Sequence, residues 1–186
     1  MTLGHLYGAS DPPLSFPPMS ELVAGIRRAR TSDASALSAI HDAAWAEAYR
    51  GIIPAIALER AIARRGPRWW LSAVRRGRPL AVFELGDRVV GYASYGRCRD
   101  GRLPAQGEID ELYFTPECQG LGFGTRLFRA VRNDLSDQGA KRVVVWALAE
   151  NERACAFYER MGGAVMAETQ DRFGGVKLRK VGFLFA

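Results

Sequence analysis

The sequence contains little cysteine or histidine and no long apolar run. Cys98, Cys118 and Cys155 are odd in number and lack CxxC spacing, which argues against a disulfide scaffold or a cysteine-based zinc site. His5 and His41 match no metal-ligand arrangement, so we expect no metal. No segment approaches the roughly 18 apolar residues of a membrane span, and the first residues lack the basic and apolar regions of a secretory signal. We expect no membrane association and a cytoplasmic location.

The composition is that of one ordinary globular domain. The chain has 186 residues, of which 48% are hydrophobic and 25% charged. We expect a flexible, Pro-rich leader at 1–22 and a single domain at 23–186. The net charge of +6 comes mostly from arginines scattered over different segments, without interleaved aromatic residues. This pattern favours a solvated basic surface that suits a phosphate-rich ligand, and no nucleic-acid partner is expected.

Hydrophobic periodicity predicts alternating helices and strands, and therefore an α/β (α+β) fold. Helical spacing follows N-cap residues near position 33, and two β-rich runs separated by Gly86 and Asp87 predict a hairpin. A nearly continuous apolar run indicates a strand covered on both faces. The predicted helices are 33–49, a stretch toward 65 that Gly66-Pro67 breaks, one from Phe123 to Gly139 and one after Asn151. The predicted strands are 26–30, 80–85, 88–95, 108–115, 141–148, 163–169 and 176–185.

A glycine-rich turn follows the predicted strand 108–115. Gly120, Gly122 and Gly124 alternate where a strand ends and a helix begins, so backbone N–H groups are left uncovered for an anion. The segment is not a Walker A loop because no Lys-Ser/Thr pair follows, and Thr125 breaks the Rossmann spacing. Taken alone, the pattern is more typical of a tight structural turn than of an anion site.

Two motifs in the same order and topology make the interpretation specific. Gln119-x-x-Gly122-x-Gly124 resembles the Gln/Arg-x-x-Gly-x-Gly/Ala signature of the GNAT (GCN5-related N-acetyltransferase) superfamily, and 151–162 resembles its Asn-x-x-Ala-x-x-Phe-Tyr-x-x-x-Gly segment. The resemblance covers about 26–185. It implies a mixed central sheet of about six to seven strands flanked by about four helices. It also implies an acyltransferase that moves an acetyl group from acetyl-CoA to a primary amine by direct attack on the thioester.

The resemblance also implies which residues hold the acetyl-CoA (coenzyme A) cofactor. The turn would hold the pyrophosphate, and the strand before it would pair with the pantetheine arm and supply a backbone N–H to the thioester carbonyl. Asn151 would reach the same arm, although a role as helix N-cap would equally explain it. The implied cofactor-binding residues are Leu112, Tyr113, Phe114, Gln119, Gly120, Leu121, Gly122, Phe123, Gly124, Thr125 and Asn151.

Three residues are candidates for proton transfer. The family places a tyrosine at Tyr158 to protonate the departing thiolate, although a core tyrosine would fit the same apolar stripe. The acceptor amine must lose a proton, since an amine of pKa about 10.4 is almost fully charged at pH 7. Glu108 and Glu111 are the candidate bases, and they should face opposite sides of the strand unless a bulge intervenes. Either could instead be a surface carboxylate.

The acceptor is expected to be a small-molecule amine. Trp45 and Tyr49 resemble residues that line the acceptor pocket in one subgroup of the family, and they could contact a cationic amine or simply pack in the core. Trp146 stands where some protein-acetylating relatives have an acidic residue, which weakens the case for a protein acceptor. A non-catalytic acyl-CoA sensor, a protein or peptide amine acetyltransferase and transfer of a longer acyl group remain alternatives. A homodimer is possible.

Overall fold

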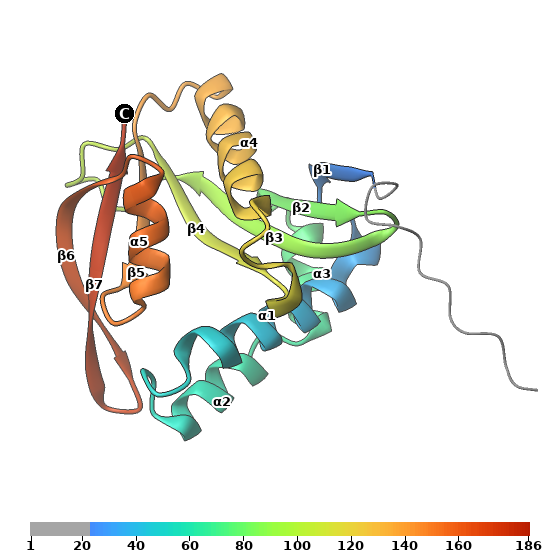
Figure 1. Cartoon of the computed structure of the whole chain (residues 1–186), viewed down its shortest axis with the longest axis horizontal. Coiled ribbons are helices and arrows are strands. Elements are labelled where there is room, and N and C mark those ends of the chain that lie inside the picture. The colour runs from blue at the N-terminus through green and yellow to red at the C-terminus, as the bar shows by residue number, and fades with distance from the viewer. Residues whose placement is uncertain (1–22) are drawn as a thin grey trace, which may run out of the picture.

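The computed structural model describes residues 23–186, and the predicted leader at 1–22 lies outside them. Within the described residues, seven strands form one mixed sheet in the order β1-β2-β3-β4-β5-β7-β6 (Figure 1). All neighbouring strands are antiparallel except β4 and β5, which are parallel. The strands are β1 (Ala24–Arg28), β2 (Leu80–Leu85), β3 (Arg88–Arg97), β4 (Gly107–Phe114), β5 (Val143–Leu148), β6 (Ala164–Phe173) and β7 (Val176–Phe185).

Five α-helices and two short 3-10 helices accompany the sheet in this part of the chain. None of these helices is long and apolar enough to cross a membrane. The elements confirm the predicted α/β fold, with one helix more than expected. The helices are α1 (Ala34–Tyr49), α2 (Ala55–Ala63), α3 (Pro67–Arg75), α4 (Phe123–Asp137) and α5 (Glu152–Arg160), with 3-10 turns at Thr31–Asp33 and Pro116–Cys118.

The additional helix is α3, which begins where the sequence indicated a break. Gly66 and Pro67 end the helical pattern of α2, but proline at the first position of a helix needs no hydrogen-bond partner for its missing N–H. Pro67 therefore starts α3 rather than a loop. The helix buries Trp70 completely and Ala73 almost completely against the sheet.

Helices cover both faces of the sheet and bury a separate core on each (Figure 1). On one face, α4 contributes Leu127, Phe128, Val131 and Leu135, with Tyr158 from α5 beside them. On the other face, α1 and α3 pack their apolar residues against β2 and β3. Because both faces are covered, β5 can be an almost uninterrupted apolar strand, as its sequence predicts.

Strands β4 and β5 separate after a short paired segment at the middle of the sheet. Their parallel pairing extends only from Gly107–Val143 to Ile109–Val145. Beyond Ile109, the edge of β4 that faces β5 has no strand partner in the sheet, and backbone groups left there remain available for a ligand. The separation creates a gap that α1 and α5 border, and the candidate site lies in it.

Candidate active site

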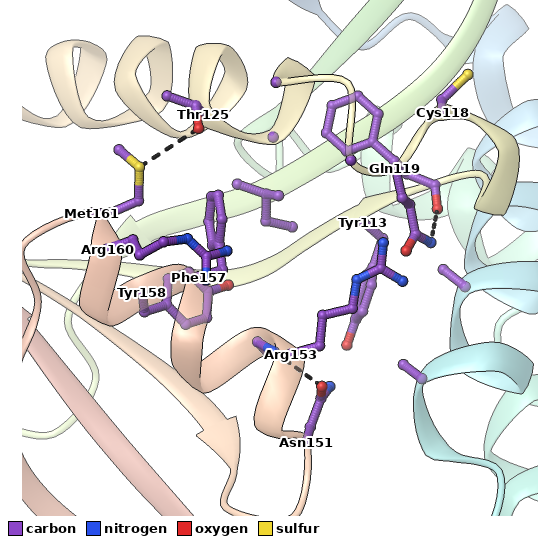
Figure 2. Close-up of a pocket in the computed structure, with 18 of the residues that line it drawn as sticks. Tyr113, Cys118, Gln119, Thr125, Asn151, Arg153, Phe157, Tyr158, Arg160 and Met161 are labelled. Atoms are coloured by element: carbon purple, nitrogen blue, oxygen red, sulfur yellow. Dashed lines mark hydrogen bonds between the residues drawn. The ribbon is translucent and has the colours of Figure 1, made fainter.

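A cleft of about 700 Å³ occupies the gap between β4, α1, the start of α4 and α5 (Figure 2). The lining combines glycines, which expose their backbone, with aromatic, thioether and arginine side chains. It contains Ala44, Glu47, Ala48, Leu112, Tyr113, Phe114, Cys118, Gln119, Gly120, Gly122, Gly124, Thr125, Arg129, Asn151, Arg153, Ala154, Phe157, Tyr158, Arg160 and Met161.

The glycine-rich turn at the start of α4 adopts backbone conformations that require glycine. Gly120 and Gly122 have φ values of 75° and 81°, a left-handed region that other residues rarely enter. Gly122 is also the N-cap of α4, so the first free N–H groups of the helix follow it directly. A Cβ at Gly120 or Gly122 would meet nothing within 4 Å, which shows that the space above the turn is open. The turn can accept an anion at close range.

Three basic side chains line the cleft together with this turn. Arg129, Arg153 and Arg160 line the same cleft, and the Gln119 amide donates to the Phe114 carbonyl oxygen at 3.2 Å. Several cationic groups around a helix N-terminus form a favourable setting for phosphate groups. The residues present therefore fit a ligand that carries several phosphates, as coenzyme A does.

Tyr158 lies on α5 with its ring in the core and its side chain lining the cleft. The residue is 7% exposed and packs edge-on against Phe157, with a ring-centroid distance of 5.2 Å. Burial, with smaller contributions from Tyr49 and Cys155, raises the pKa of Tyr158. Its hydroxyl therefore stays protonated at neutral pH. The sequence left open whether Tyr158 is a core residue or a proton donor at the site. Its side chain both packs in the core and lines the cleft.

Asn151 performs the capping role that its position predicts. Its side-chain oxygen accepts a hydrogen bond from the Ala154 N–H at 3.1 Å, at the N-terminus of α5. The same residue lines the cleft, and Figure 2 shows its side chain at the cleft edge below Arg153. The cap alone accounts for an asparagine here, and the amide group also remains next to the cleft.

A β-bulge in β4 decides how its carboxylates are arranged. Ile109 pairs with Tyr95 and Glu111 with the adjacent Ser94, so Asp110 is an extra residue without a partner on β3. Ile109 belongs to the core under α4, whereas Glu111 contacts Tyr92 of the opposite core. The bulge therefore reverses the usual alternation and places Glu111 on the face that Glu108 also occupies.

Glu108 is held by Arg99, whose backbone and guanidinium both donate to its carboxylate. Arg99 also pairs with Asp110, a residue that the sequence analysis did not select. Burial raises the pKa of Asp110, although Arg99 and Arg78 oppose that shift. Two adjacent acidic residues in a strand break the alternation of buried and exposed positions. That break was the sequence signal for a bulge and for Asp110.

Glu111 lies in a mostly buried ion pair. Its side chain is 8% exposed and pairs with Arg65, which follows α2, and it accepts a hydrogen bond from the Tyr92 hydroxyl at 3.3 Å. The Arg65 guanidinium also lies over the rings of Trp45 and Trp69, at 5.8 and 5.0 Å from their centroids. The Trp45 ring, which could have contacted a cationic amine, is therefore in contact with a cation of the chain itself, Arg65.

Trp45 and Tyr49 form a layer behind the cleft wall. Their rings are 5.0 Å apart, and the Tyr49 hydroxyl is 2.8 Å from the Tyr113 hydroxyl. Burial raises the pKa of Tyr49, with the hydrogen bond to Tyr113 acting in the opposite direction. On α1 it is Ala44, Glu47 and Ala48 that line the cleft.

The structure brings most, but not all, of the sequence-predicted site residues to the cleft wall. Neither Leu121, which is 51% exposed, nor Phe123, which packs on the core, is among the residues that line the cleft. The residues from the sequence prediction that do line it are Leu112, Tyr113, Phe114, Gln119, Gly120, Gly122, Gly124, Thr125, Asn151 and Tyr158; those outside its lining are Glu108, Glu111, Leu121, Phe123, Trp45 and Tyr49.

Known proteins share both the sequence pattern and the fold. An uncharacterised N-acetyltransferase, YuaI of Bacillus subtilis, is 28% identical over 157 residues, which cover 84% of this chain and 90% of that protein. The mycothiol acetyltransferase of Paenarthrobacter aurescens is 44% identical over 83 residues, which cover 45% of this chain but only 26% of that protein. The PaiA N-acetyltransferase of Thermoplasma acidophilum, solved in complex with coenzyme A, superposes with a TM-score of 0.67 at 16% identity, covering 85% of this chain and 98% of that one.

The family model for the Acetyltransferase (GNAT) family matches residues 37–163, a segment that contains most of α1, the glycine-rich turn and α5. This match confirms the resemblance that the two motifs indicated, and with it the prediction of an acyltransferase enzyme. The chain belongs to the GNAT family of acetyltransferases.

Proposed function

We propose that this protein is an acetyl-CoA-dependent N-acetyltransferase whose acceptor is a small-molecule primary amine. One observation carries the proposal: the unpaired edge of β4, the glycine-rich turn and Tyr158 all border the same cleft. A strand edge, an anion site and a protonated phenol are the groups needed for the arm, the phosphates and the thioester of acetyl-CoA. The turn and Arg129, Arg153 and Arg160 would hold the phosphates.

The reaction forms a C–N bond and breaks a C–S bond. The neutral amine attacks the thioester carbonyl carbon, and a backbone N–H of β4 beyond Ile109 donates to the carbonyl oxygen as negative charge develops there. The thiolate then leaves and takes a proton from the Tyr158 hydroxyl. A phenol is already protonated at neutral pH and burial raises its pKa further, so the Tyr158 hydroxyl carries a proton to donate. The proton lost by the amine restores the Tyr158 hydroxyl, so the products are the amide and the neutral thiol.

Glu111 is our candidate for the base that removes the amine proton, acting through water. The pKa of Tyr113, which lines the cleft, is raised by burial, by the neighbouring Tyr49 and by the negative charge of Glu111, in decreasing order. Both glutamates are paired with an arginine, Glu108 with Arg99 and Glu111 with Arg65, so position decides between them. Glu108 lies three residues earlier on β4, before the strands separate. A water relay is required because the carboxylate of Glu111 does not line the cleft.

Two observations favour a small-molecule acceptor over a protein amine. The Paenarthrobacter aurescens relative is named after mycothiol and not after a protein acceptor, although the match covers a limited part of that relative. Trp146 on β5 packs against Gly182 of β7, with Lys180 over its ring at 5.6 Å. Lys180 is itself paired with Asp171 at 3.1 Å, and Trp146 supplies no carboxylate to attract the positively charged N-terminus of a peptide.

The test is release of free thiol from acetyl-CoA in the presence of a panel of primary amines near pH 8. The wild-type protein is compared with Tyr158→Phe, which removes only the hydroxyl. Tyr95→Phe is the matched control, because the Tyr95 hydroxyl bonds to Asp134 at 2.7 Å and Tyr95 does not line the cleft. We expect amine-dependent release that falls at least tenfold in Tyr158→Phe and less than twofold in Tyr95→Phe.

Other outcomes distinguish the alternatives. Coenzyme A binding without thiol release for any amine would support an acyl-CoA sensor. Release with a peptide but with no small amine would support a protein or peptide acceptor, and faster release from longer acyl-CoA donors would change the donor. A protein that does not bind coenzyme A would refute the proposal.

A further inference from the structure

A glutamate of α1 bridges two groups that belong to the predicted cofactor site. The Glu47 carboxylate accepts a hydrogen bond from the Gln119 amide at 2.9 Å and pairs with the Arg153 guanidinium at 3.3 Å. Gln119 begins the glycine-rich turn before α4, and Arg153 lies in the first turn of α5. Figure 2 shows Gln119 and Arg153 on different walls of the cleft. The bridge therefore connects three elements across the cleft.

The charge of Glu47 is opposite to that of its surroundings. Among the described residues that line the cleft, it is the one acidic side chain, whereas Arg129, Arg153 and Arg160 are basic. The side chains of Glu47 and Arg153 are 43% and 62% exposed. An ion pair this exposed to water is weak, so it can open without a large cost when a competing anion arrives.

Competition is expected because Glu47 and a phosphate group need the same donors. A phosphate offers oxygen acceptors that suit both an arginine guanidinium and an amide N–H. When Glu47 holds Gln119 and Arg153, it occupies an N–H group of each, and its negative charge also repels any anion in the cleft. Both effects weaken binding of a phosphate-rich ligand.

We propose that Glu47 is an internal competitor of the cofactor phosphates, which limits the affinity of the cleft for coenzyme A and thereby favours its release after transfer. This role rests on the proposed function, because it requires that the cleft binds coenzyme A. Glu47 acts on affinity through Arg153 and Gln119 and takes no part in the acyl transfer itself. Arg153 changes partner from Glu47 to a phosphate when the ligand binds.

The experiment measures coenzyme A binding by isothermal titration calorimetry for wild type and Glu47→Gln at low and high salt. Pantetheine, which lacks the phosphates, is the ligand control. Glu168→Gln is the matched variant, because Glu168 forms a similarly exposed pair with Arg179 at 3.2 Å, in the β6–β7 hairpin, and its loss changes the net charge equally. Arg153→Gln tests the bridge from its other partner.

We expect Glu47→Gln to bind coenzyme A about threefold to tenfold more tightly at low salt, with a smaller gain at high salt. Pantetheine binding should change less than twofold, Glu168→Gln should resemble wild type, and Arg153→Gln should bind coenzyme A several-fold more weakly. Unchanged or weaker binding by Glu47→Gln overturns the proposal, as does an equal gain in Glu168→Gln or for pantetheine. Failure of the wild type to bind coenzyme A would overturn the proposed function and this role with it, whereas binding without a gain overturns only the role of Glu47.

Discussion

Replacing Gly122 with alanine should separate the backbone strain of the glycine-rich turn from its use as a binding site. At φ 81° an L-residue is strained by about 1–2 kcal/mol, and no neighbouring atom adds a clash because a Cβ there meets nothing within 4 Å. For a chain of this size, each kcal/mol lowers Tm by about 2–4 °C, so Gly122→Ala should melt about 2–8 °C below wild type. The same methyl group would occupy the open space above the first N–H groups of α4.

The matched control is Gly139→Ala at the other end of α4. Gly139 has φ 90° and also has open space around it, so its replacement carries a similar strain away from the cleft. We expect both variants to lose similar stability by thermal denaturation, but only Gly122→Ala to lose at least tenfold in coenzyme A affinity, about 1.4 kcal/mol. Equal affinities of the two variants for coenzyme A would refute the assignment of the turn as the phosphate site.

Three further predictions concern stability and the cap of α5. Arg65→Ala should lower the free energy of unfolding by about 3 kcal/mol in urea titrations, because Glu111 remains buried without its cation; a loss below about 1 kcal/mol would contradict this. Asn151→Ala should lose about 1 kcal/mol from the cap, and a simultaneous loss of coenzyme A affinity would show a second role. Burial acts to raise the pKa of Asp33, but hydrogen bonds from Arg27 act in the opposite direction, and the net pKa is lowered. The contribution of Asp33 to folding stability is therefore present above about pH 4 and is lost as the pH falls further. The stability gap between wild type and Asp33→Asn should therefore be full at pH 7 and shrink toward pH 3; a gap that is constant with pH would contradict it.

The regular elements were predictable because their signals are local. Gly86 has φ 63° in the turn between β2 and β3, as the predicted hairpin requires. The amphipathic spacing of 123–135 likewise predicted α4, which begins and ends close to the expected residues. The start of α3 was missed because Gly66-Pro67 can equally end one helix or begin the next, and only tertiary packing of Trp70 decides between them.

The candidate site was predictable only where its residues form motifs. The glycine-rich turn and α5 were predicted because the residues of each motif lie within one short segment of the sequence. Glu47 and Gln119 are 72 residues apart, and Arg65 and Glu111 are 46 apart, so nothing local links them. Asp110 had a local signal, two adjacent acids in one strand, but the direction of its side chain depends on the bulge opposite β3.

The charge balance on β4 bears on which amine the cleft can accept. Glu108, Asp110 and Glu111 form a row of carboxylates that would suit a polyamine if they were free. The structure instead pairs them with Arg99, Arg78 and Arg65. A ligand ammonium that displaces such an arginine from a mostly buried carboxylate leaves the arginine's charge to be solvated or paired elsewhere. The new contact must offset that cost in free energy. The row therefore offers little net attraction for additional positive charges, and we propose an acceptor that carries one amine rather than a polyamine.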